Sequence, residues 1–263
     1  MVERLTRDKT CLQTRSLVLS EITSMSESNP ASTPIDITSN TNELSINTEG
    51  TAVTIIHDEK LYKRYLTVWN RRTRYADGRE VEWDIVGHDI PTPTFVCVFT
   101  FDTKKKETCL IKEFCQGTNE VVSFTRTESS RHKVPLTKYT CAAGAYDRKK
   151  HTSPLDTAQQ ELSEEARLTL GTWISLLPPA QPQGISELKW GRNRFIPYLV
   201  LDPIVDSAPL ARDVEEYMEV RSGVPISKFR EMVMRGEVLL PSVQTGWMAI
   251  EWLRKEGYLE EGV

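Results

Sequence analysis

The stretch that decides the fold is Gln160-Glu161-Leu162-Ser163-Glu164-Glu165. On a helix, Glu161 lies three residues before Glu164 and four before Glu165, so the three carboxylates crowd one face. Leu162 points to another face, which is suited to packing on a sheet. Like charges at this spacing destabilise an isolated helix by about 0.2–0.5 kcal/mol per pair.

Few cations are placed to relieve this repulsion. Arg167 can pair with Glu164, but no basic residue stands at positions 157, 158, 168 or 169. A divalent cation would remove the conflict, and carboxylate oxygens suit Mg²⁺ or Mn²⁺ better than zinc. The alternative is a solvated acidic helix face, and these few residues alone leave both interpretations open.

The residues upstream narrow the choice. Ala142-Ala-Gly-Ala-Tyr-Asp147 follows a predicted strand at 138–141, and Ser153-Pro154 supplies an N-cap and a first helical residue. Together with the acidic helix, this resembles the Nudix hydrolase signature, a loop–helix–loop written G-x5-E-x7-R-E-U-x-E-E-x-G-U with U aliphatic. The matching positions are Gly144, Glu161, Leu162, Glu164, Glu165 and Leu168.

The chain departs from that signature at several positions. Thr152 stands where the signature has its first Glu, Gln160 where it has Arg, and Arg167 where it has the late Gly. The loop after Gly144 holds seven residues instead of five. Cys115 aligns with an arginine that is often found on the strand before the box. These changes affect the support of the helix more than its metal-facing acids.

The flanking sequence resembles the subgroup of ADP-ribose and nucleoside-diphosphate-sugar pyrophosphatases. The similarity covers roughly residues 55–258 and includes Ala143-Gly144, the acidic segment 212–220 and the C-terminal stretch 236–253. It implies an α/β fold, a Nudix-type α/β/α sandwich around a mixed β-sheet, with an N-terminal β-extension at 53–90. The whole Nudix domain is expected to span 53–263.

The resemblance also implies a site. Glu161 and Glu165 are the expected principal ligands of Mg²⁺ or Mn²⁺, and the carbonyl of Ala143 is a further one. Glu164 is expected to be catalytic as another ligand, direct or through water. Glu216 is the candidate general base or ligand of a third metal ion, with Glu215 as the close alternative.

Candidate substrate residues come from the segment 184–194. Arg192 and Arg194, together with Lys189, could hold phosphates, and the indole of Trp190 could stack on a base. The alternative is a loop and strand edge with solvated charges.

Local patterns predict the remaining elements. Strands are expected at 62–69 and 80–86, joined across Asp77-Gly78, a strong turn signal. The run Lys104-Lys105-Lys106 is expected to be a solvated hairpin tip between two further strands. A loop is expected at 126–138 and late helices at 227–235 and 241–255. Further strands are expected at 94–101, 108–114, 172–177 and 195–201.

The amino-acid composition limits the class of protein and the compartment in which it is expected. The 263 residues carry 33 Lys and Arg against 37 Asp and Glu, a net charge of −4, which argues against a generally basic nucleic-acid binder. Residues 1–52, rich in Ser, Thr and Asn from residue 23 onward, are expected to form a disordered tail. No membrane association is expected. Five cysteines without a C-x-x-C pair favour a reducing compartment, the cytoplasm, with mitochondrion or plastid as alternatives.

These observations favour a pyrophosphohydrolase acting on a small nucleotide substrate such as ADP-ribose or a nucleotide sugar. The alternative is a catalytically impaired Nudix-fold module that binds a nucleotide, an RNA 5′ end or a protein partner. Activity on capped or triphosphorylated RNA is a third interpretation. By analogy with the similar subgroup, a homodimer formed through the β-extension is expected.

Overall fold

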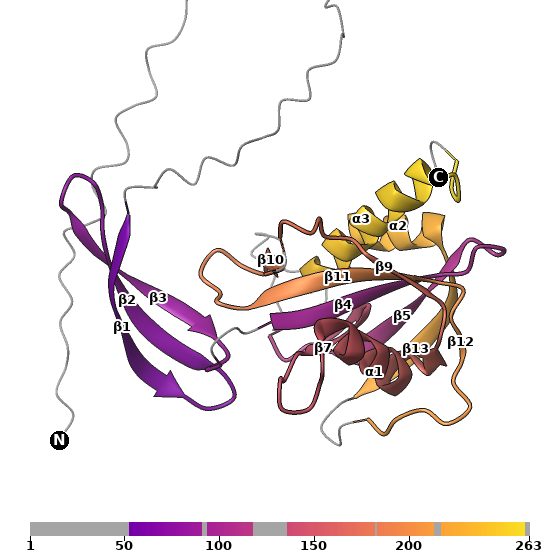
Figure 1. Ribbon diagram of the computed structural model, residues 1–263, viewed down its shortest axis with the longest axis horizontal. Coiled ribbons are helices and arrows are strands. Elements are labelled where there is room, and N and C mark those ends of the chain that lie inside the picture. Colours follow the sequence, from indigo (N-terminus) through magenta and orange to yellow (C-terminus); the bar gives the residue numbers. More distant parts are fainter. Residues whose placement is uncertain (1–52, 91–93, 118–135, 182, 213–216, 261–263) are drawn as a thin grey trace, which may run out of the picture. The chain divides into compact units, whose positions relative to one another are not determined.

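The computed structural model describes residues 53–90, 94–117, 136–181, 183–212 and 217–260. The predicted tail at 1–52 and most of the predicted loop at 126–138 lie outside these ranges. Within them, the chain forms the strands and helices expected of an α/β protein (Figure 1). The strands are β1 Thr54–Lys63, β2 Thr67–Arg74, β3 Glu80–Gly87, β4 Thr94–Phe101, β5 Glu107–Phe114, β6 Thr137–Thr140, β7 Ala142–Ala145, β8 Leu168–Thr169, β9 Thr172–Ser175, β10 Ile185–Ser186, β11 Arg194–Leu201, β12 Ile204–Val205 and β13 Met218–Pro225.

The central sheet is mixed. Its order is β10-β11-β4-β7, and β9 pairs with β11 further along the edge that β10 occupies. β11 runs parallel to β4, whereas β4 and β7 are antiparallel. A second sheet has the order β13-β5-β6, with antiparallel pairs throughout.

The three helices cover both faces of the central sheet. They are α1 Pro154–Ala166, α2 Ile226–Met234 and α3 Leu240–Lys255. Alternation along β4 shows the layering, because successive side chains of a strand point to opposite faces. Val96 and Val98 pack with Leu162 of α1, while Phe99 packs with Phe229 of α2. The predicted α/β/α sandwich is confirmed (Figure 1).

The sheet of β1, β2 and β3 forms the N-terminal extension. The turn predicted at Asp77-Gly78 is confirmed, with Gly78 at a φ of 82°. The predicted single strand at 62–69 is wrong, because the chain turns at 64–66, where the Arg64 N–H donates to the Leu66 carbonyl. Residues 64–66 contain none of the usual turn formers, so the aromatic and aliphatic residues around them looked like one strand.

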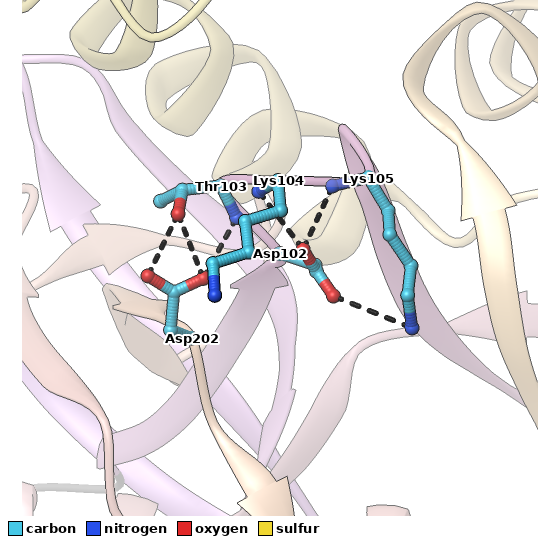
Figure 2. A network of polar contacts seen from close by, with 5 residues as sticks. All are labelled: Asp102, Thr103, Lys104, Lys105 and Asp202. Atoms are coloured by element: carbon cyan, nitrogen blue, oxygen red, sulfur yellow. Dashed lines mark hydrogen bonds and ion pairs between the residues drawn. The ribbon is translucent and has the colours of Figure 1, made fainter.

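The lysine run forms the turn between β4 and β5, as predicted. Asp102 accepts hydrogen bonds from the backbone N–H groups of Lys104 and Lys105 at 2.9 and 2.8 Å. Asp202 accepts from the backbone N–H and the hydroxyl of Thr103 (Figure 2). Two aspartates therefore order the backbone of this turn, and the three lysine side chains are exposed.

The structure also describes the state of four cysteines and the length of the helices. The cysteines at 97, 109, 115 and 141 are all free thiols. Among the described residues, no helix has both the length and the hydropathy needed to cross a lipid bilayer.

Candidate functional site

Helix α1 carries the predicted acids against strand β7. Glu165 is buried, with 5% of its surface exposed, and its Oε2 accepts a hydrogen bond of 2.8 Å from the backbone N–H of Ala143. Glu164 is half-buried one residue earlier. The helix therefore directs Glu165 at the residue whose carbonyl the resemblance implicates in metal binding.

Glu161 lies directly over Gly144. A Cβ atom at position 144 would stand 1.7 Å from Glu161 Oε1 and 2.1 Å from its Cδ. With any larger residue at position 144 the carboxylate would have to move, so the glycine is what lets Glu161 occupy this position over the strand. Glu161 and Glu165 thus meet two consecutive residues of β7, Gly144 and Ala143.

The beginning of α1 is held by a different device. Ser153 caps the helix by accepting from the Asp156 N–H at 3.1 Å, and Pro154 is its first residue. Asp156 in turn accepts from the Thr152 N–H at 2.8 Å and from the Gln160 side chain at 3.1 Å. Hydrogen bonds from Thr152 and then Gln160 lower the pKa of the Asp156 carboxyl.

Thr152 and Gln160 are the two positions where the chain departs from the signature Glu and Arg. The structure links them through Asp156, which accepts hydrogen bonds from both. One carboxylate with two neutral donors takes the place of a charged pair. This network leaves no buried charge unpaired at these two positions.

The end of α1 explains a further departure. Arg167 adopts a φ of 60°, in the left-handed region, and its N–H bonds the Leu162 carbonyl. This is the conformation that favours glycine at a helix end, as the signature has it. Here Arg167 tolerates the strain and donates from its guanidinium to the Leu210 carbonyl.

Arg212 ties the downstream segment to the same helix. Its guanidinium donates to the carbonyl oxygens of Glu165 at 2.8 Å and Glu164 at 3.3 Å, in the last turn of α1. The cation thereby satisfies carbonyl groups that a helix leaves unpaired at its C-terminus. The sequence pattern of the acidic segment 212–220 does not predict this role of Arg212.

The candidate bases Glu215 and Glu216 lie outside the described residues. Arg212, directly before that gap, contacts α1, and the carbonyl of Met218, two residues after it, accepts from Arg212 at 3.3 Å. Arg212 therefore joins the last turn of α1 to the start of β13.

The predicted substrate residues lie close together but differ in their contacts. Arg194 donates to the carbonyls of Gln183 and Gly184 and to the Ser186 hydroxyl, so its guanidinium braces a loop. Arg192 stacks over the ring of Trp69 at 4.5 Å. Trp190 is 58% exposed.

An apolar cavity of about 470 Å³ opens at Ala143. Three aromatic side chains line it, with His88 between Tyr65 and Phe95 at ring-centroid distances of 5.3 and 5.0 Å. Glu113, Glu187 and Arg194 supply charged groups in the lining. No local sequence pattern indicates this cavity, because its walls come from segments far apart in the chain.

The fit of a divalent metal ion can be judged from the donors. Within the described ranges, no group of three His, Cys, Asp or Glu side chains is arranged to hold a metal ion. Two carboxylates nevertheless converge on Ala143 and Gly144, and all of these donors are hard oxygens. The residues fit Mg²⁺ or Mn²⁺ in chemistry, with Glu161, Glu165 and the Ala143 carbonyl as the groups that would hold it.

Comparison with known proteins supports the fold. No family model and no curated protein sequence matches this chain. A solved structure described as an ADP compounds hydrolase matches with a TM-score of 0.58 and 15% identity, covering 79% of this chain and 97% of that one. A MutT structure, from a study of Aliivibrio salmonicida and Vibrio cholerae MutT, covers 54% of this chain and 85% of that one, with 14% identity and a TM-score of 0.32.

The first match shows that this chain has a Nudix-type fold. The resemblance seen in the sequence and the architecture of the structure therefore agree. The matching positions of the sequence motif lie on β7, α1 and β8.

Proposed function

We propose that this protein hydrolyses a pyrophosphate bond in a nucleoside diphosphate linked to another group, using Mg²⁺ or Mn²⁺. The observation that carries the proposal is the convergence of Glu161 and Glu165 on Gly144 and Ala143. A glycine that must be bare to admit a carboxylate is the feature expected of a built site, because a merely solvated acidic face needs no such space.

Different residues have different roles in the proposed reaction. Glu161, Glu165 and the Ala143 carbonyl hold the cation, and Glu164 completes or orients its shell. When bound, the metal ion neutralises the pyrophosphate and activates water. Glu216, or Glu215 in its place, takes the proton from the attacking water. Arg212, which precedes these acids in the chain, bonds the last turn of α1.

The preferred substrate class is ADP-ribose or a nucleotide sugar. The matched structure is described as hydrolysing ADP compounds, and the apolar cavity beside Ala143 suits a nucleobase. A base could stack against Tyr65, His88 or Phe95, while its phosphates lie toward Glu161.

The test is turnover of a substrate panel, including ADP-ribose, nucleotide sugars and capped RNA, with Mg²⁺ or Mn²⁺. Glu165→Gln should lower kcat by about 100-fold or more, since one metal ligand loses its charge. Glu256→Gln, an exposed acid after α3, is the matched control and should retain full activity. Turnover that is absent throughout, or equal in both variants, refutes the proposal.

A second candidate is a nucleotide-binding module without turnover. The neutral residues at Thr152 and Gln160 favour it, because they replace a charged pair that supports the helix in the family. Calorimetry showing nucleotide or RNA 5′-end binding, with no product formed under any metal condition, would establish this alternative.

We also propose a homodimer formed through the β-extension. Strand β1 exposes large apolar side chains, among them Ile55, Leu61 and Tyr62, each more than half exposed. Light scattering should give twice the chain mass of 30.0 kDa. Leu61→Glu should give the monomer, whereas Met234→Glu, which places the same charge on α2, should not. A wild-type monomer refutes the proposal.

A further inference from the structure

A second cavity, of about 690 Å³, has a strongly basic lining. Its described lining contains no Asp or Glu and five cationic side chains. These are Arg71, Arg148, Lys189, Arg192 and Arg194. They come from β2, from the loop between β7 and α1, and from the segment that leads into the first residue of β11. Folding therefore brings positive charges together on one cavity, although the net charge of the chain is −4.

Three of these five cations, Arg148, Lys189 and Arg194, have no acidic partner among the described residues, whereas Asp58 attracts both Arg71 and Arg192. Arg71 is neutralised by Asp58 through two hydrogen bonds of 2.8 and 2.7 Å. Arg194 bonds carbonyl and hydroxyl groups, which satisfy its donors without cancelling its charge. Arg148 and Lys189 are exposed and make no ion pair with any described residue. Clustered like charges are unfavourable unless an anion joins them.

The cavity also has a defined place relative to the acids. Pro154, the first residue of α1, lines it, so the positive end of the helix dipole faces the same space. Glu161 follows seven residues later, about 10 Å along the helix axis. Arg194 lines both this cavity and the apolar one at Ala143. The two cavities are therefore adjacent, and the helix that carries the acids begins at the basic one.

We propose that the basic cavity binds a phosphate monoester that the substrate carries in addition to the pyrophosphate to be cleaved. This deepens the proposed function, on which it rests, by naming the substrate class as a phosphorylated nucleotide. Arg148, Lys189 and Arg192 contact the phosphate, and Arg194 positions the loop that closes the cavity. Tyr146, also in the lining, packs beside the bound group.

The experiment compares two probes that differ by one phosphate monoester, NADP⁺ and NAD⁺. Binding to the full chain is measured by calorimetry without divalent metal, so no turnover is required. The wild type should bind NADP⁺ about ten-fold more tightly than NAD⁺, the size of one good charge-assisted contact. The double variant Arg148→Ala with Lys189→Ala should bind both probes equally.

The matched control removes two charges from the same loop without touching the cavity. Lys149→Ala with Lys150→Ala should keep the ten-fold preference, because neither lysine lines the cavity. Equal binding of both probes by the wild type overturns the proposal, as does a control variant that loses the preference. Inorganic phosphate that binds as tightly as NADP⁺ also overturns it, by assigning the cavity to free phosphate.

The two proposals fail in different ways. Absence of hydrolysis together with an intact preference for NADP⁺ refutes the hydrolase and leaves the phosphate cavity standing. Hydrolysis of ADP-ribose with no such preference refutes the cavity alone.

Discussion

The two halves of α1 hold their carboxylates in different ways. In the first half, Asp156 is satisfied by neutral donors, the Thr152 N–H and the Gln160 amide. In the second half, Glu161 and Glu165 face strand β7. Gly144 has no side chain to obstruct Glu161, and the Ala143 N–H donates a hydrogen bond to Glu165.

This difference separates the residues that stabilise the start of the helix from the residues that we propose bind the metal ion. The first half departs from the family signature, yet its hydrogen bonds still hold the start of the helix. The second half keeps all three acids of the signature, of which Glu161 and Glu165 face β7. We therefore expect changes in the second half to act on metal binding and rate, and changes in the first half to act on stability alone.

The largest expected effect comes from breaking the second half. Glu161→Gln removes one charge from the metal-facing pair while preserving the size of the side chain over Gly144. We expect kcat to fall by about 100-fold or more while the melting temperature stays within about 2 °C. Steady-state kinetics and a thermal melt measure the two. Full activity in this variant would show that the acids of this half are not ligands.

Filling the space over Gly144 tests the same contact from the strand side. Gly144→Ala places a methyl group 1.7 Å from Glu161 Oε1, so the carboxylate or the strand must move. Because the overlapping atoms are the end of a flexible side chain, the expected cost in unfolding free energy is small, about 1 kcal/mol or less, and the main expected effect is weaker metal binding.

A double variant identifies the cause of that cost. If the clash is with Glu161, then Gly144→Ala should cost much less stability when Glu161 is already Ala, and chemical denaturation measures the coupling. Additive effects would mean that the carboxylate does not occupy this space.

The smallest effect is expected in the first half and depends on pH. Hydrogen bonds lower the pKa of Asp156, so the stability they confer is present above the pKa of the unfolded chain and is lost as pH falls through the folded-state pKa. Asp156→Ala should lower the melting temperature by a few degrees at pH 7, and this difference should shrink as the pH falls below 3.8, the ordinary pKa of this side chain. The activity of the folded variant should be unchanged. A pH-independent loss would contradict the role of this carboxylate.

Much of this arrangement could be predicted from local sequence. The helix start at Ser153-Pro154, the turn at Asp77-Gly78 and the acid spacing on α1 each follow from a few adjacent residues. The layered fold followed from the same signals together with the family resemblance, because strands and helices alternate in a recognisable order.

Other features depended on contacts between distant segments. The role of Asp156 needed the positions of Thr152 and Gln160 around one turn, and the bonds of Arg212 join residues 47 and 48 positions apart. The turn at 64–66 carried no turn residue. The sequence places Arg192 and Arg194 in one segment, but only the structure distinguishes a guanidinium that braces a loop from one that stacks on Trp69.

The most direct test of the account is a titration of Mn²⁺ followed by electron paramagnetic resonance. Adding the wild-type protein should reduce the signal of free Mn²⁺, and the double variant Glu161→Gln with Glu165→Gln should leave that signal unchanged. Asp156→Ala should behave like the wild type. Equal binding of Mn²⁺ by the wild type and the double variant, or no binding by either, would contradict the claim that these two carboxylates form a metal site against β7.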